Sequence, residues 1–226
     1  SWEYEGLRFD SYVLNPIERL LVADAPGWRT NKGIELNAPP IQEIITERTG
    51  TDRLSSRFVA VLAPSKTDEP IVKKAHIVAE ELSGDAILIA VEHGGGVDYI
   101  ASALDRRRHT LGPVTFTGGF GFISTDPGGA VATSFLMDGT ELRFGSYTHV
   151  MPTGRVSIGV RSTSGSTYRV EPGTSLPKTA KGMCLLAGGT GYAIESVKGD
   201  TITVRDYPAA PADSVTVVYS SWKKGR

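Results

Sequence analysis

The sequence predicts an all-β protein, built as an antiparallel β-sandwich with a small β extension at its C-terminal end. Three observations point to this class. The 26 glycines and 13 prolines interrupt the chain at short intervals, which is typical of strands joined by turns. Between them lie runs of β-branched and aromatic residues, many alternating with polar ones. No helical stretch of about ten residues separates these runs, which excludes a sheet built from β-α-β units.

The expected strands follow one another closely along the chain. They cover 57–62, 71–78, 86–91, 97–102, 120–123, 130–136, 141–144, 155–161, 191–197, 201–205 and 214–219. Asp138-Gly139 is a strong hairpin dipeptide and predicts a turn between two of them. Segment 40–48 is the one candidate helix, although its β-branched residues suit a strand nearly as well. Two packed antiparallel sheets are the natural way to bury so many strands.

The length of 226 residues fits one large β domain or two small ones. The stretch 171–178, which is rich in proline and glycine, is the candidate domain boundary. We therefore expect an antiparallel sandwich over 1–170. A small β subdomain over 171–226 would pack on the sandwich or extend it.

Composition and charge narrow the function. The formal net charge is −1, so no bulk electrostatic attraction draws the chain to nucleic acid or to an anionic membrane. No apolar stretch reaches the roughly 20 residues that a membrane span needs. The chain starts at Ser1 without methionine or a signal peptide, and we interpret it as a processed or truncated piece of a longer protein. The single cysteine, Cys184, lies in an apolar run that predicts a buried, inert thiol.

Tyr147 and His149 are the candidate catalytic residues. They lie two positions apart, so a strand places both side chains on one face. Tyrosine and histidine are suited to removing a proton next to a carboxylate. The plainer interpretation is an aromatic ring and an imidazole on a half-buried strand.

Two further clusters are candidates for substrate binding. Arg106, Arg107 and Arg108 form a basic loop that suits an anionic sugar chain through charge-assisted hydrogen bonds. A solvated turn is the alternative. Trp28 and Arg29 follow a Pro-Gly pair and would present an indole to a sugar ring. A tryptophan that covers the edge of the core is the alternative there.

Glycine clusters at 93–97, 117–121 and 187–191 raise the question of a phosphate loop. Such a loop needs a strand before it and a helix after it. A strand follows each cluster here, which favours hairpin turns. The four histidines have no metal-ligand spacing with a carboxylate cluster, so no metal site is predicted. His93 and Asp98 are expected to meet by a hydrogen bond across the first glycine turn.

The order of several strand ends and turns resembles a known family. The features are Arg57-Phe58 leading to Val61-Leu-Ala-Pro64, then 71–72 and 86–91, a glycine turn into 97–100, and finally 116–121 and 139–142. In this order they resemble the C-terminal sheet region of heparinase II/III-like polysaccharide lyases. The likeness covers about residues 10–150, and the tail is compatible with it.

The resemblance implies a two-part, secreted or periplasmic bacterial enzyme. An N-terminal α/α toroid would carry most of the cleft, and the sandwich would close one side. The reaction would be β-elimination on an acidic polysaccharide that contains uronic acid. The family's histidine-rich sheet motif has no counterpart here, so no cofactor is expected in this chain. A structural divalent metal would belong elsewhere in the full-length enzyme. With the toroid missing, we expect this chain to be inactive alone and transfer no catalytic residue from the family.

Two other functions remain open from the sequence. One is a non-catalytic carbohydrate-binding module, which predicts saccharide affinity that depends on Trp28 or on Arg106 to Arg108. The other is a structural or interaction β protein, which predicts a stable oligomer without any response to glycans.

Overall fold

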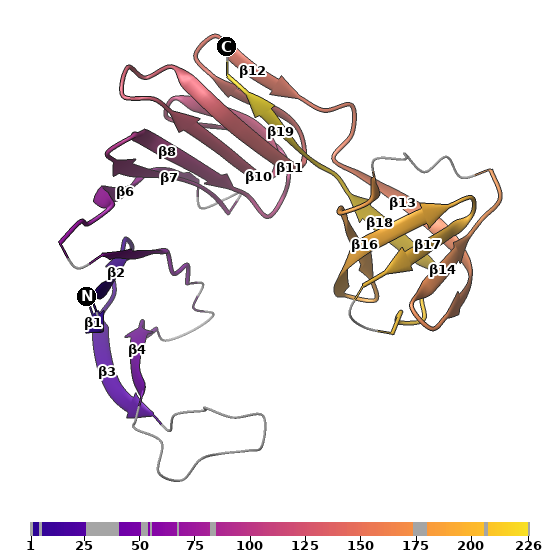
Figure 1. Ribbon diagram of the computed structural model, residues 1–226, viewed down its shortest axis with the longest axis horizontal. Coiled ribbons are helices and arrows are strands. Elements are labelled where there is room, and N and C mark those ends of the chain that lie inside the picture. Colours follow the sequence, from indigo (N-terminus) through magenta and orange to yellow (C-terminus); the bar gives the residue numbers. More distant parts are fainter. Residues whose placement is uncertain are drawn as a thin grey trace. The chain divides into compact units, whose positions relative to one another are not determined.

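The computed structural model describes residues 2–4, 6–25, 41–50, 54, 56–66, 68–81, 85–173, 180–205 and 208–225. Over these residues the chain forms nineteen β-strands and no α-helix, and every strand pairing is antiparallel (Figure 1). The predicted all-β class is confirmed. The chain divides into two compact units, Ser1–Ile71 and Val72–Arg226.

The N-terminal unit contains two small sheets. Strands β1 (Trp2–Tyr4), β2 (Leu7–Val13) and β5 (Ala60–Lys66) form one, and β3 (Arg19–Ala25) pairs with β4 (Ile41–Glu47) in the other. Within the ambiguous segment 40–48, residues Ile41–Glu47 thus form a strand. Its β-branched residues pair with β3 over seven positions, which overrides the helical spacing.

The second unit begins with an eight-stranded sheet. Its main path is β12 (Tyr147–Val150), β11 (Val131–Phe144), β10 (Val114–Thr125), β8 (Gly96–Ser102), β7 (Ala86–His93) and β6 (Val72–Glu81). Two short strands complete it: β9 (Arg108–Leu111) pairs with β10, and β19 (Ser220–Lys224) pairs with β11. Each of the long strands β10 and β11 therefore pairs with two shorter strands along one of its edges.

One face of this sheet forms a hydrophobic core. Alternate residues of β10 and β11 are buried there because side chains of a strand point to opposite faces in turn. Fully buried members are Leu88, Leu111, Phe116, Ile123, Leu136 and Leu142. The opposite face carries half-buried and exposed side chains.

The remaining strands close into a barrel with a separate core. Its order is β13 (Arg155–Ser164), β14 (Thr167–Val170), β17 (Thr201–Val204), β16 (Thr190–Lys198), β15 (Cys184–Ala187) and β18 (Ser214–Val218). Tyr168, Leu185, Ile194, Ile202 and Val217 fill it. The chain leaves the sheet after β12, traces the barrel and returns to the sheet as β19.

The expected domain boundary between residues 170 and 171 is not present in the structure. That point lies inside the barrel, because β13 and β14 come before it and pair with β18 and β17 after it. A closed barrel needs all six strands, and the break in composition lies between two of them in sequence, β14 and β15. Strand β19, expected in the small subdomain, belongs to the large sheet.

Two predicted turns are wrong, and both lie where β10 and β11 meet. Asp138-Gly139 forms no hairpin but lies inside β11 at an irregularity of the register, where Asp138 has φ 55°. A Cβ on Gly139 would lie 2.4 Å from the Thr117 carbonyl oxygen. Glycine is therefore needed at this position because the two strand backbones approach each other closely. Cluster 117–121 likewise lies within β10. The clusters at 93–97 and 187–191 are the expected hairpin turns.

Candidate functional site

Tyr147 and His149 converge on one buried serine. Both side chains project from β12 toward Ser134 of the neighbouring β11. The Ser134 Oγ lies 2.8 Å from the Tyr147 hydroxyl and 2.8 Å from the His149 Nδ1. Sequence spacing predicts that the tyrosine and histidine share a face. It does not reveal the serine that joins them.

The C-terminal strand β19 completes this cluster. His149 Nε2 lies 2.7 Å from the Ser221 Oγ, and the Tyr147 hydroxyl donates to the Lys223 carbonyl oxygen at 3.4 Å. The Lys223 ammonium lies 5.2 Å from the centroid of the Tyr147 ring. We call Ser134, Tyr147, His149, Ser221 and Lys223 the relay cluster. It joins the consecutive strands β11 and β12 to β19, which lies far along the chain, with 72 positions between His149 and Ser221.

Burial sets the protonation of the histidine. Ser134 is fully buried and His149 is 3% exposed. This burial, with a smaller contribution from the Lys223 charge, lowers the pKa of His149 below its usual 6.5. The imidazole is therefore neutral near pH 7, with one nitrogen donating and the other accepting.

The geometry gives an unbroken chain of proton donors and acceptors. It runs from the half-buried Tyr147 hydroxyl through Ser134 to His149 and on to Ser221. A proton that leaves Tyr147 can reach the imidazole in two short steps. Ser134 and His149 are buried, whereas Tyr147 and Ser221 are half-buried and Lys223 is exposed. Contact with a substrate is therefore open to Tyr147, Ser221 and Lys223.

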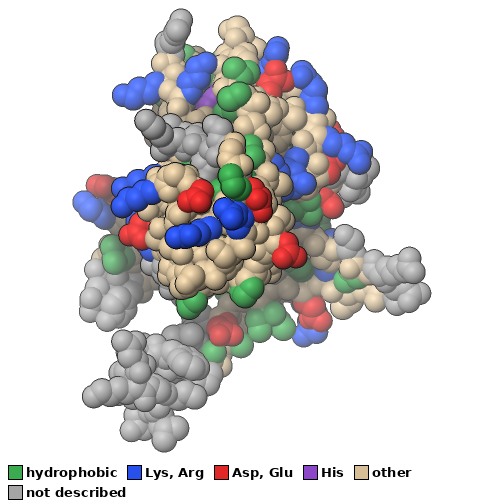
Figure 2. Space-filling view, turned by 90° about the vertical axis from the view of Figure 1, so that its right-hand side faces the viewer, with side chains coloured by type: hydrophobic (Ala, Val, Ile, Leu, Met, Phe, Trp, Pro, Cys, Tyr) green, Lys and Arg blue, Asp and Glu red, His purple; other side chains and the backbone are tan. Residues whose placement is uncertain are grey.

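The arginine loop is matched by carboxylates. Arg108 lies 2.5 Å from Glu141, Arg107 lies 3.7 Å from Asp105, and Arg106 lies 3.9 Å from Asp138. Local acids therefore balance much of the basic charge, and a role in sugar binding stays a prediction. Figure 2 shows Lys and Arg side chains interspersed with Asp and Glu on the face of the molecule that it presents.

His109, next to this loop, is held between two acids. Its Nδ1 lies 2.9 Å from Glu81 and its Nε2 lies 2.7 Å from Asp105, with the side chain 4% exposed. Burial alone would lower its pKa, but hydrogen bonds to the two carboxylates together raise it above 6.5. Sequence reasoning missed this arrangement because Glu81 lies on β6, 28 residues away.

His93 and Asp98 approach each other across the glycine turn, but the expected hydrogen bond is not formed, since neither His93 Nε2 nor Asp98 Oδ1 has a hydrogen-bond partner among the described residues. The Nε2 of His93 lies 3.3 Å from the Asp98 carboxylate, while its Nδ1 accepts a hydrogen bond from the Gly95 amide at 3.1 Å. No group of three or more histidine, cysteine or acidic side chains in the described part of the chain is arranged to hold a metal ion.

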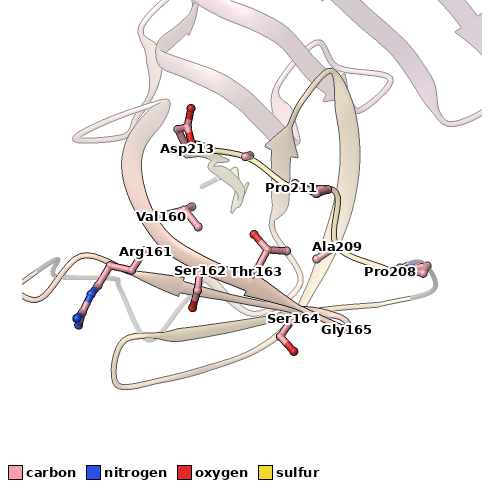
Figure 3. A pocket seen from close by; sticks show the side chains of 11 residues that line it. Val160, Arg161, Ser162, Thr163, Ser164, Gly165, Pro208, Ala209, Pro211 and Asp213 are labelled. Carbon is pink, nitrogen blue, oxygen red and sulfur yellow. The ribbon is translucent and has the colours of Figure 1, made fainter.

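A hollow of about 420 Å³ lies on the barrel, and it is poor in reactive groups. Residues 160–165 and 208–213 supply its walls. Figure 3 shows hydroxyl side chains along β13 and small apolar side chains in the segment before β18, with Arg161 extending away from the rest. Among the described residues, Asp213 is the one carboxylate that lines it, so we place no chemistry there.

The other binding candidates, Trp28 and Arg29, lie outside the described residues. Over the residues that are described, no helix is long and apolar enough to cross a membrane. The chain matches no protein-family model. A search of curated proteins likewise finds no relative.

Proposed function

We propose that this chain is the β-sheet part of a heparinase II/III-like polysaccharide lyase. It would cleave an acidic polysaccharide by β-elimination, together with a helical toroid domain of the same protein, in the periplasm or outside a bacterial cell. The observation that carries the proposal is the relay cluster, in which the Tyr147 hydroxyl is linked through Ser134 to a neutral histidine.

The chemistry of β-elimination suits these groups. Tyr147 passes its proton through Ser134 to His149 and then accepts the proton from the carbon next to the uronate carboxylate. The electrons of that C–H bond form the new double bond, and the bond to the glycosidic oxygen breaks. The leaving oxygen takes the proton back from the tyrosine hydroxyl, and His149 returns its proton. The Lys223 ammonium, close to the Tyr147 ring, favours the carboxylate and acidifies that carbon.

The N-terminal unit supports the idea of a second domain. Most large apolar side chains that the described residues expose lie in it: Leu7, Phe9, Leu20, Val22, Ile45, Leu54, Phe58, Leu62 and Ile71. Exposed apolar area of this extent marks interaction surfaces. A helical domain of the same protein is the occupant that the proposal assigns to it.

The test is a lyase assay on this chain and on the full-length gene product. Formation of unsaturated uronate is followed by its ultraviolet absorbance with alginate, heparin and similar polymers. We expect no turnover by this chain and turnover by the full-length protein. In the latter, Tyr147→Phe should lower kcat by about 10²- to 10⁴-fold, whereas Lys198→Gln, at an exposed lysine of the barrel, should not.

Two outcomes would contradict the proposal. One is turnover by the 226-residue chain alone. The other is a full-length Tyr147→Phe variant that retains the wild-type kcat on a polymer that the parent cleaves.

A further inference from the structure

The face of the large sheet opposite its core carries a continuous apolar row. Cross-strand partners define it, since residues directly opposite in neighbouring strands point to the same face. The row consists of Ile77, Ile89, Ile100, Phe122, Phe135 and Trp222, one from each of six strands. With strands about 4.8 Å apart, it extends for about 24 Å.

Trp222, at the end of this row, is an open stacking surface. Its side chain is 67% exposed although it is the largest apolar residue of the row. The Phe135 ring lies 4.8 Å from it and the Phe122 ring 6.1 Å, measured between centroids. The two phenylalanines support the indole from the sheet side, while most of its surface meets solvent.

A polar row runs parallel to the apolar one, two residues further along each strand. Its members are Asp98, Ser124, Thr133 and Lys224, again direct cross-strand partners. The Asp98 end is matched by His93. At the other end Lys224 is exposed, and among the described residues no carboxylate lies within ion-pair distance of its ammonium. Thr133 donates its hydroxyl proton to the Lys223 carbonyl oxygen at 3.3 Å, which leaves its own oxygen as an acceptor.

We infer that this face binds an acidic glycan, with one sugar ring stacked on Trp222. A sugar ring has an apolar C–H face and an edge of hydroxyls, and these match an indole with a row of hydroxyls beside it. Lys224, two residues from Trp222 on the same face, supplies the complementary charge for a carboxylate or sulfate. A neutral glycan or an apolar protein surface would leave this ammonium without a counter-charge.

This site is separate from the relay cluster. Along β19 the side chains alternate, so Ser221 and Lys223 contact Tyr147 and His149 while Trp222 and Lys224 lie on the opposite face. The inference therefore stands whether or not the protein is a lyase.

The test is binding of the chain to alginate and heparin by isothermal titration calorimetry, with neutral dextran for comparison. We expect affinity for the acidic polymers only. Trp222→Ala should weaken it at least about tenfold, in line with the energy of ring stacking. Lys224→Gln should weaken it and reduce its dependence on salt. Leu104→Ala and Lys198→Gln, at an exposed leucine and an exposed lysine elsewhere, are the matched controls.

Several results would overturn the inference. They are the absence of binding to either acidic polymer, equal binding to dextran, and unchanged affinity in both Trp222→Ala and Lys224→Gln. A dimer that dissociates on Trp222→Ala, without glycan affinity, would assign the face to a second copy of the chain. Circular dichroism of each variant excludes loss of fold as the cause of weak binding, and Lys224→Gln repeats the test at an exposed residue.

Discussion

The barrel and the large sheet of the second unit bury different kinds of side chains. The barrel core consists of apolar residues and tyrosines, whereas the sheet buries His109, Thr125, Ser134 and His149. A buried polar group lowers stability unless it is hydrogen-bonded. The sheet satisfies its groups through pairs that are distant in sequence, such as His149 with Ser221. The contrast places the candidate chemistry in the sheet.

Closure of the barrel explains part of this difference. Its six strands leave no open edge among the described residues, so its interior is packed for stability. Even its buried tyrosine follows this rule: burial raises the pKa of Tyr168 to about 12, and its hydroxyl donates to the Ala210 carbonyl oxygen at 2.9 Å. The sheet, in contrast, ends at β12 and β19, and the relay cluster lies at that edge.

The largest expected effect comes from breaking the barrel core. Tyr168→Ala should lower the free energy of unfolding by about 4 kcal/mol, because it leaves a large cavity at a fully buried position. Tyr168→Phe should cost about 1 kcal/mol, since it removes only the hydrogen bond to Ala210. Urea denaturation followed by circular dichroism measures both. Equal losses would mean that the hydroxyl, rather than packing, stabilises the barrel.

A smaller loss is expected from the polar core of the sheet. Ser134→Ala removes the shared partner of the Tyr147 hydroxyl and the His149 Nδ1. It should cost about 2 kcal/mol, the usual effect of leaving buried polar groups unpaired. Ser157→Ala on the barrel removes an exposed hydroxyl pair with Thr216 and should change stability by less than about 0.5 kcal/mol. Equal losses in the free energy of unfolding for Ser134→Ala and Ser157→Ala in urea denaturation would contradict the proposed difference between the two cores.

Prediction from sequence succeeded where the signal was local. Alternation and turn residues predicted the all-β class and the hairpin turn before Val97. The Tyr147 and His149 spacing predicted a shared face. The prediction failed where one sequence signal has two structural uses: Asp138-Gly139 has the preferences of a turn, but a strand irregularity needs the same positive φ.

The rest of the site depends on pairings that a single sequence does not contain. Ser134 and Ser221 are separated by 87 positions in the chain, and both contact His149 only because β19 returns to pair with β11. The Arg106 to Arg108 loop shows the opposite case. Its residue types suggest an anion site, yet its charges face Asp138, Asp105 and Glu141. Burial and cross-strand register decide both outcomes.

The two buried histidines of the sheet should respond to pH in opposite directions, with effects smaller than that of Ser134→Ala. The pKa of His109 is raised, so its contribution is complete below pH 6.5 and declines as pH rises through the folded-state pKa. The pKa of His149 is lowered, so its contribution is complete above pH 6.5 and declines as pH falls toward the folded-state pKa.

Variants separate these two contributions. The stability difference between wild type and His109→Gln should shrink from about pH 5 to about pH 8. The difference for His149→Gln should shrink in the reverse direction. Urea denaturation at several pH values between these limits measures both. Parallel pH dependences would show that Glu81 and Asp105 do not hold a charged His109.

The smallest effect is expected at Arg107, which tests whether the charged loop matters for the sheet at all. Its side chain is 81% exposed and its ion pair with Asp105 spans 3.7 Å. Exposed pairs of this kind contribute little, so Arg107→Ala should change the free energy of unfolding by less than about 0.5 kcal/mol. Asp105 also binds His109, so Asp105→Asn should cost more than Arg107→Ala. If Arg107→Ala instead costs more than Asp105→Asn, the exposed arginine is the stabilising residue of the loop. The hydrogen bond between Asp105 and the buried His109 would then contribute little to the stability of the sheet, contrary to the contrast drawn with the barrel.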